Sequence, residues 1–173
     1  MCGIAGFYSS RRNYTGEEGR WRAVLEKMNR VQKRRGPDEE GKFLCAHCGL
    51  AHVRLSIIDL HRGRQPMTRT WRGKTCTVSF NGEIYNMPEL RRELEQEGAV
   101  FESDSDTEVI IQGYLLHGEG YVKKLNGIFA VALWDHNEDS LYLFRDRAGV
   151  KPLFYMIQED TVIFASELKG IFA

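Results

Sequence analysis

The second residue of the chain is a cysteine, preceded only by Met1 in the opening MCGIAGFYSS. Removal of an initiator methionine before this small residue would leave Cys2 with a thiol and a free α-amine. The thiolate is the reactive form, with a reference pKa of about 8.5, and an α-amine with a pKa of about 8 can accept the thiol proton. Cys2 can therefore be a covalent nucleophile that carries its own base. Taken alone, however, a cysteine at this position is more often a small apolar residue in a strand than a nucleophile.

Three further cysteines raise the alternative of a metal site. Cys45-Ala-His-Cys48 is a C-x-x-C with a histidine inside it, and Cys76 is the other available partner. Zinc sites usually combine two such pairs, or one pair with H-x₃₋₅-H, and the sequence has neither pattern. We therefore expect no metal site. We interpret 45–48 as a strand hairpin that turns at Ala46-His47, with all three cysteines structural.

The composition indicates one globular domain, or one lobe of a larger protein. The chain has 173 residues, 42% of them hydrophobic, which is enough for a substantial core. Its 24 basic and 24 acidic side chains balance, so charge gives no argument for a nucleic-acid or membrane partner. MCGIAGFY lacks the features of a secretory leader, and the longest apolar run, 128–134, is too short to cross a bilayer. We expect a cytoplasmic protein with reduced cysteines and neither of those partners.

Hydrophobic periodicity and turn residues predict the elements that must position Cys2. Thr15-Gly-Glu-Glu18 has the pattern of a capping box, so a helix should run from it to the turn at Gly36-Pro37. Two more helices are expected at 86–98 and at 105–118, the second capped by Ser105. Strands are expected at 3–8, 43–58 (with the turn at 46–47), 75–80, 127–135, 140–146, 152–158 and 162–167.

This order of elements indicates an α+β domain in layers. Runs of strands with grouped helices are typical of stacked sheets covered by helices. The segment 128–134, IFAVALW, is apolar at consecutive positions, which indicates a strand buried on both faces. One face would pack on a second sheet and the other on helices. The predicted arrangement is helix, sheet, sheet, helix.

Seven motifs in order carry a resemblance to a known family. They are MCGIAG at 1–6, RRGPDEEG at 34–41, LAHVRLSIIDL at 50–60, SFNGEIYN at 79–86, SDTEVI at 105–110, LNGIFAVALWD at 125–135 and FRDRAGVKPLFY at 144–155. Together they resemble the glutamine amidotransferase domain of the asparagine synthetase type, whose members are N-terminal-nucleophile hydrolases. The resemblance covers essentially residues 1–173. It implies a four-layer αββα sandwich, with two stacked, mainly antiparallel sheets flanked by helices, in agreement with the layer argument.

The resemblance implies release of ammonia from glutamine through a thioester on Cys2. The tetrahedral intermediates of this reaction carry an oxyanion, which needs two preorganised donors. Asn81 can supply its carboxamide N–H and Gly82 its backbone N–H. The alternative is that Asn81-Gly82 forms a hairpin turn, the commonest use of this pair. With NGEIYN intact and Cys2 present, we favour the oxyanion hole.

The same resemblance assigns residues to the two charges of glutamine. A planar α-carboxylate suits the guanidinium fork of Arg54, and Asp106 corresponds to the acceptor of the α-ammonium. The alternatives are a surface ion pair for Arg54 and a helix-terminal carboxylate for Asp106. Further contacts with the substrate are implied for Leu55, Ile57, Ile58 and Glu83. Arg35 and Asp38 are expected to shape the loop beside the nucleophile.

The family also implies a partner domain. Its members deliver ammonia to an ATP-dependent synthetase domain that adenylates a carboxylate, aspartate being the commonest acceptor. We therefore expect L-glutamine as ligand, no cofactor for these residues, and ATP with Mg²⁺ for a C-terminal synthetase domain. A homodimer is left open. So are two other functions: a relative that has lost glutaminase activity, and a non-catalytic module that senses a metal through Cys45, His47, Cys48 and Cys76.

Overall fold

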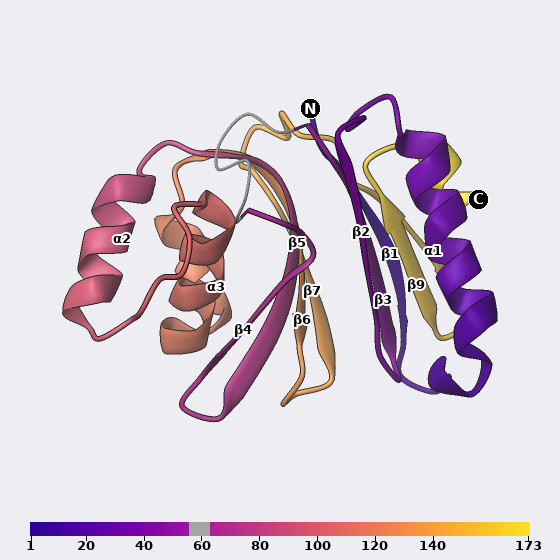
Figure 1. The fold of residues 1–173 in the computed structure, drawn as a ribbon, viewed down its shortest axis with the longest axis horizontal. Helices are drawn as coiled ribbons and strands as arrows, with labels where there is room; N and C mark the ends of the chain where they lie inside the picture. Colours follow the sequence, from indigo (N-terminus) through magenta and orange to yellow (C-terminus); the bar gives the residue numbers. More distant parts are fainter. Residues whose placement is uncertain (56–62) are drawn as a thin grey trace.

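Two antiparallel sheets stacked face to face form the centre of the molecule, and helices cover both outer faces (Figure 1). A computed structural model describes residues 1–55 and 63–173. One sheet has five strands in the order β2-β3-β1-β9-β8, and the other has four in the order β4-β5-β6-β7. Helices α1 and α4 pack on the first sheet, and α3 packs on the second with α2 outside it. The predicted four-layer αββα class is confirmed.

The elements have the following bounds. The strands are β1 (Gly3–Ser9), β2 (Glu39–Leu44), β3 (Cys48–Arg54), β4 (Met67–Trp71), β5 (Lys74–Ile84), β6 (Gly127–Asp135), β7 (Ser140–Arg145), β8 (Phe154–Gln158) and β9 (Thr161–Ala165). The helices are α1 (Glu18–Gln32), α2 (Met87–Gln96), α3 (Asp106–His117) and α4 (Leu168–Ile171), with 3₁₀ turns η1 (Thr15–Glu17) and η2 (Glu119–Lys124).

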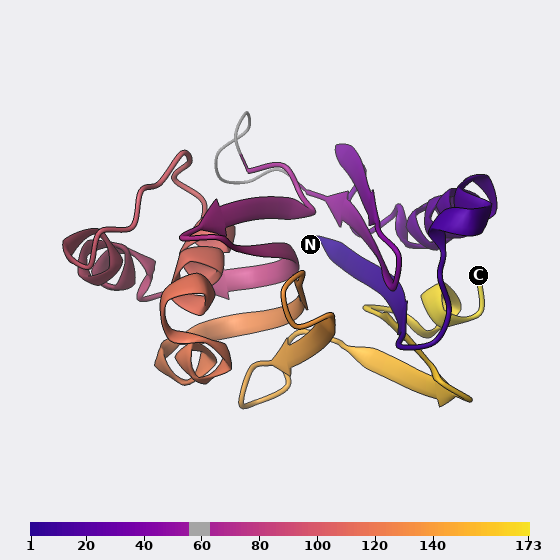
Figure 2. The same ribbon diagram turned by 90° about the horizontal axis from the view of Figure 1, so that it is seen from below.

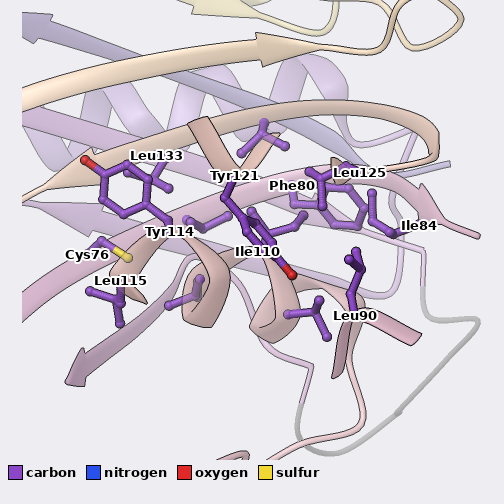
Figure 3. Close-up of a cluster of buried hydrophobic side chains, with 14 of the residues drawn as sticks. Cys76, Phe80, Ile84, Leu90, Ile110, Tyr114, Leu115, Tyr121, Leu125 and Leu133 are labelled. Atoms are coloured by element: carbon purple, nitrogen blue, oxygen red, sulfur yellow. The ribbon is translucent and has the colours of Figure 1, made fainter. Parts of the chain in front are cut away.

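Strand β6 is buried on both faces, as its run of consecutive apolar residues predicts. Its residues Phe129, Val131 and Leu133 point into the core beneath α3, part of which Figure 3 shows. The alternate residues Ala130, Ala132 and Trp134 belong to a second core, which lies between the sheets and includes Ile4, Leu50 and Phe164. A third core lies beneath α1. Because side chains alternate along a strand, consecutive apolar residues fill two cores at once.

Several element boundaries differ from the predictions. The capping box is wrong: α1 begins at Glu18 with no side-chain cap, and the Thr15 hydroxyl instead bonds Asn13 Oδ1 at 2.7 Å. Helix α2 is shorter than 86–98, and β4 was not predicted. The Ser105 cap of α3 is confirmed, since its side chain accepts the Glu108 N–H. The predicted strand 43–58 is the hairpin β2–β3, and its residues 56–58 lie outside the described residues.

Strand β5 continues to Ile84, beyond the predicted end at Phe80. Asn81 pairs with Ala130 and Gly82 with Phe129 in the ladder between β5 and β6. The alternative of a hairpin turn at Asn81-Gly82 is therefore wrong. Both residues lie within β5, beyond the part that pairs with β4.

The helices of the described chain are short. The longest of them, α1, has 15 residues and carries charged side chains along its length. Spanning the hydrocarbon core of a bilayer takes about 20 apolar residues. No helix within residues 1–55 and 63–173 meets this requirement.

Candidate active site

A pocket of about 180 Å³ opens where the N-terminus meets the edges of both sheets. Figure 2 shows the N-terminus between the two sheets in the perpendicular view as well. Seven of the nine predicted site residues line the pocket: Cys2, Arg54, Leu55, Asn81, Gly82, Glu83 and Asp106. The other two, Ile57 and Ile58, lie outside the described residues. The pocket also contacts Met1, Gln65 and Lys151, which sequence reasoning did not assign to the site.

Cys2 immediately precedes β1 and is held from two sides. Its thiol lies 3.7 Å from the carbonyl oxygen of Leu55. Its own carbonyl oxygen accepts a hydrogen bond from Arg35 Nε at 2.9 Å, and Arg35 is paired with Glu167 at 3.8 Å. The expectation that Arg35 shapes the surroundings of Cys2 agrees with this contact. The Leu55 carbonyl therefore holds the sulfur at the pocket, and the Arg35 side chain holds the backbone of Cys2.

Side chains alternate between the two faces of β5, and this places the side chain of Asn81 on the face toward the sheet that contains β1 and β3. Ser79, two residues earlier on the same face, donates to the carbonyl of Ala51 in β3, so odd-numbered side chains of β5 face that sheet. Phe80 and Ile84 instead join the core beneath α3 (Figure 3). Asn81 is 2% exposed, and its Nδ2 has no hydrogen-bond partner in the described part of the chain. A buried amide donor without a partner is unusual in a folded protein.

The backbone N–H of Gly82 points to an open edge of β5. The N–H groups of Phe80 and Ile84 are taken by Gln65 Oε1 and Asp106 Oδ2, away from β6. Phe129, the partner of Gly82 in the ladder, gives its own N–H to Asp146 on the opposite side. Residues two apart in a strand orient their N–H groups alike, so the Gly82 N–H faces the edge that β4 leaves uncovered. Asn81 and Gly82 thus offer two donors at adjacent positions.

Glycine at position 82 is also required by packing. A Cβ atom built there would lie 2.2 Å from the carbonyl oxygen of Ile128 and 2.7 Å from Cα of Phe129. Both are backbone atoms of β6 and cannot move aside cheaply. A larger residue would therefore push β5 away from β6 and displace the neighbouring Asn81.

Arg54 ends β3 and is 5% exposed. Its Nη1 lies 3.1 Å from Glu39 Oε2, and Glu39 also pairs with the exposed Arg64. The neighbouring loop fixes the strand end, since the Asp38 N–H donates to the Arg54 carbonyl at 3.0 Å. An ion pair, as in the alternative explanation, exists, but its Arg54 side is buried and lines the pocket. Arg54 therefore presents a guanidinium whose position is set by its neighbours.

Asp106 is the first residue of α3 and lines the same pocket as Arg54. Burial raises the pKa of its carboxyl to about 6, against the lowering effect of the Ile84 and Thr107 N–H groups. The helix-terminal alternative and the substrate-binding role are compatible, because the helix N-terminus favours a carboxylate there. A cationic group bound beside Asp106 would hold it in the charged form.

Two buried residues that the sequence did not reveal hold this geometry together. Glu108 Oε1 lies 2.7 Å from Arg69 Nε, and Glu108 Oε2 accepts the N–H of Ser103 at 2.7 Å, which orders the loop that leads to Asp106. Burial alone would raise the pKa of Glu108, but these donors outweigh it and the pKa is lowered. His52 Nε2 lies 3.1 Å from the Phe80 carbonyl, which ties β3 to β5 beside Asn81. The glutamate belonged to a recognised motif, but its long-range partners left no local signal.

The remaining cysteines do not form a common site. Cys48 belongs to the core between the sheets, whereas Cys76 lies in the core beneath α3, on the far face of the second sheet. Burial raises the pKa of the Cys45, Cys48 and Cys76 thiols, which keeps them protonated. Nowhere in the described residues do three His, Cys, Asp or Glu side chains converge to hold a metal ion.

Cys2, directly before β1, lines one pocket with Asn81 and Gly82 of β5 at the edges of the stacked sheets, the arrangement that an amidotransferase-type site would need. The whole chain, residues 1–173, matches the family model described as a glutamine amidotransferase domain, and the chain belongs to this family. It is 40% identical over 173 residues to asparagine synthetase [glutamine-hydrolyzing] 3 of Bacillus subtilis (strain 168), with 100% of this chain and 28% of that protein covered. It is 41% identical over 172 residues to asparagine synthetase [glutamine-hydrolyzing] of Sandersonia aurantiaca, with 99% and 31% covered.

The fold has a solved counterpart. A glutamine phosphoribosylpyrophosphate amidotransferase from B. subtilis, in a structure with ADP and GMP, superposes with a TM-score of 0.79 at 18% identity. The match covers 99% of this chain and 43% of that one. At this identity the likeness concerns the fold, and it supports the αββα assignment. The chain spans about a third or less of the length of the curated relatives described above.

Proposed function

We propose that this domain hydrolyses the side-chain amide of glutamine to glutamate and ammonia through a thioester on Cys2. The observation that carries the proposal is the convergence of Cys2, Arg54, Asn81, Gly82 and Asp106 on one pocket. These residues come from the position before β1 and from β3, β5 and α3, and the first and last of them are more than a hundred positions apart in the chain. Their chemistry matches the parts of one amino-acid amide: two charges to bind, one carbonyl to attack and one oxyanion to stabilise.

In the proposed reaction the sulfur of Cys2 attacks the side-chain carbonyl carbon of glutamine. The carbonyl oxygen becomes an oxyanion that accepts hydrogen bonds from Asn81 Nδ2 and the Gly82 N–H. When the carbonyl re-forms, the C–N bond breaks, and the nitrogen leaves as ammonia with the proton taken from the thiol. Water then attacks the thioester, which releases glutamate and restores the thiol.

The proton transfer in this scheme requires removal of Met1. With Met1 attached, the nitrogen of Cys2 is an amide and has no basic lone pair. Met1 also lines the pocket, so its removal would both free the α-amine and enlarge the space in front of the sulfur. The amine would take the thiol proton and return it to the leaving nitrogen.

We propose further that the ammonia passes to a C-terminal synthetase domain that uses ATP and Mg²⁺. The relatives named above are called glutamine-hydrolyzing asparagine synthetases and are about three times as long as the matched region or longer. Aspartate is the ammonia acceptor that these names favour. A cytoplasmic location agrees with the use of ATP.

The test is ammonia release from glutamine, measured directly, in the 173-residue chain with loss of Met1 confirmed by intact mass. Cys2→Ala should abolish release while circular dichroism stays unchanged, and Cys45→Ala serves as the matched control and should keep full activity. More than a trace of activity in Cys2→Ala would refute the nucleophile. An inactive wild-type chain that still binds glutamine would favour the relative that has lost glutaminase activity.

A further inference from the structure

Lys151 is a buried cation at the pocket that the proposed reaction has not used. Its side chain lines the same pocket as Cys2, and the residue is only 9% exposed. Its Nζ lies 3.3 Å from the thioether sulfur of Met1. Removal of Met1 would take this contact away and leave the ammonium at the pocket that Cys2, then the N-terminal residue, also lines.

A tightly bonded loop places Lys151 there. Asp146 Oδ1 accepts the N–H of Val150 at 2.9 Å, and Asp146 Oδ2 accepts the N–H of Lys151 at 3.0 Å. Arg145 Nε donates to the Lys151 carbonyl at 2.7 Å, and Gly149 has a φ of 64° that few other residues adopt. Burial raises the pKa of Asp146, but these backbone donors outweigh it and lower the pKa overall. The motif RDRAGVK is thus built to hold a lysine at a set position.

The ammonium of Lys151 has no carboxylate partner within residues 1–55 and 63–173. Two carboxylates that contact pocket arginines or their neighbours are engaged elsewhere: Glu39 pairs with Arg54 and Arg64, and Glu167 pairs with Arg35 and Lys169. Asp106 and Glu83 line the pocket from α3 and β5, and neither forms an ion pair with Lys151 among the described residues. A cation withdrawn from water without an anion is costly. An anion that forms in this pocket during the reaction would offset that cost.

We propose that Lys151 stabilises the anionic sulfur of Cys2 once Met1 has been removed. The positive charge favours the thiolate over the thiol by direct attraction. It also favours the neutral α-amine over the ammonium form by repulsion, so the amine is free to accept the proton. Both effects raise the fraction of Cys2 that is ready to attack at neutral pH. The inference rests on the proposed function for its meaning, but the charge effect on Cys2 can be measured without glutamine.

The experiment follows the rate of Cys2 alkylation by iodoacetamide against pH. The N-terminal peptide is quantified by mass spectrometry, so Cys45, Cys48 and Cys76 do not contribute. Lys151→Met removes the charge and keeps the side-chain length, Lys151→Arg keeps the charge, and Lys27→Met removes an exposed lysine on α1 as the matched control. In Lys151→Met we expect the midpoint to rise by about 0.5–1 pH unit, which makes alkylation at pH 7 about 3–10-fold slower. Lys151→Arg and Lys27→Met should follow the wild type.

The outcomes separate this inference from the proposed function. An unchanged midpoint in Lys151→Met, or an equal shift in Lys151→Arg, overturns the role of the charge. A rise in KM for glutamine without any change in the alkylation profile also overturns it, because Lys151 would then contact the substrate instead. If Lys151→Met does not fold, as judged by thermal melting, Lys151→Gln provides the same test. A wild-type chain that shows the alkylation effect but releases no ammonia contradicts the glutaminase reaction alone.

Discussion

Truncation of Asn81 to alanine should separate catalysis from folding. If Nδ2 is one of two oxyanion donors, its loss should lower kcat for glutamine hydrolysis about 10²–10³-fold, equivalent to ~2.7–4 kcal/mol of transition-state stabilisation. The donor is buried and makes no hydrogen bond to the described residues, so folding loses no bond with it. A buried unpaired donor itself costs about 1–3 kcal/mol, and relief of that cost offsets the lost packing. We expect the free energy of unfolding to change by less than about 1 kcal/mol.

Asn86, five residues further on, is the matched control. Its Nδ2 donates to the Lys124 carbonyl at 3.0 Å, and its Oδ1 accepts the Asn126 N–H at 2.9 Å. Asn86→Ala should therefore lower the free energy of unfolding by about 1–2 kcal/mol and leave kcat unchanged. Steady-state ammonia release and urea unfolding of both variants provide the comparison. The reasoning fails if Asn81→Ala keeps kcat within about fivefold of wild type, or if it loses as much stability as Asn86→Ala.

Three further predictions concern binding and proton transfer. Arg54→Lys keeps the charge but loses the fork, so KM for glutamine should rise about tenfold or more with little change in kcat. Arg64→Lys, which alters the exposed partner of the same Glu39, should change neither constant. Asp106→Asn should raise KM yet stabilise the fold at pH 7 by up to about 3 kcal/mol, because burial raises the pKa of Asp106 from 3.8 to about 6. The folded chain holds the Asp106 proton more tightly than the unfolded chain, so the contribution of Asp106 to stability is greatest below pH 4 and is lost as the pH rises through 6. Urea unfolding at pH 4 and pH 7 should therefore show the stability gain of Asp106→Asn at pH 7 only. A chain forced to keep one residue before Cys2 should bind glutamine but hydrolyse it at least ~10²-fold more slowly, and equal ammonia release from the two forms, checked by intact mass, would exclude the α-amine as the base.

Layers and core positions could be predicted because they depend on local periodicity. The run 128–134 predicted a strand between two cores, and β6 fills both. Ser105 was identifiable as a helix cap because its side chain acts within one turn of α3. Both signals are contained in a few consecutive residues, so tertiary contacts had little opportunity to override them.

The errors arose where a local pattern competes with contacts from elsewhere. Thr15-Gly-Glu-Glu18 has the spacing of a capping box, but the Thr15 hydroxyl bonds Asn13 and the chain first forms a 3₁₀ turn. Strand β4 alternates threonine with larger residues and gave no clear apolar signal, yet it pairs with β5 from Met67 to Trp71. Its existence depends on β5 offering an edge, which a single segment cannot reveal.

The site residues differ in the same way. Cys2 and Asn81-Gly82 were identifiable because the motifs name them, whereas the positions of Lys151 and Glu108 depend on partners elsewhere in the fold. Lys151 lies within a recognised motif, but its access to the pocket depends on the loop bonded to Asp146. The orientation of the Gly82 N–H could not be predicted either, because it depends on the register between β5 and β6.

The limit of the pairing between β4 and β5 determines which backbone donors of β5 stay open. β4 covers β5 only as far as Val78, so the N–H groups of Phe80, Gly82 and Ile84 emerge at an open edge. Buried backbone donors are nearly always paired, and Gln65 and Asp106 satisfy the first and the third. The second, at Gly82, has a satisfied donor on either side. Beside it lies Asn81 Nδ2, which has no hydrogen-bond partner among residues 1–55 and 63–173. Four more paired residues before Met67 would extend β4 to the position opposite Gly82 and close this edge. The proposed oxyanion hole therefore depends on where strand pairing ends.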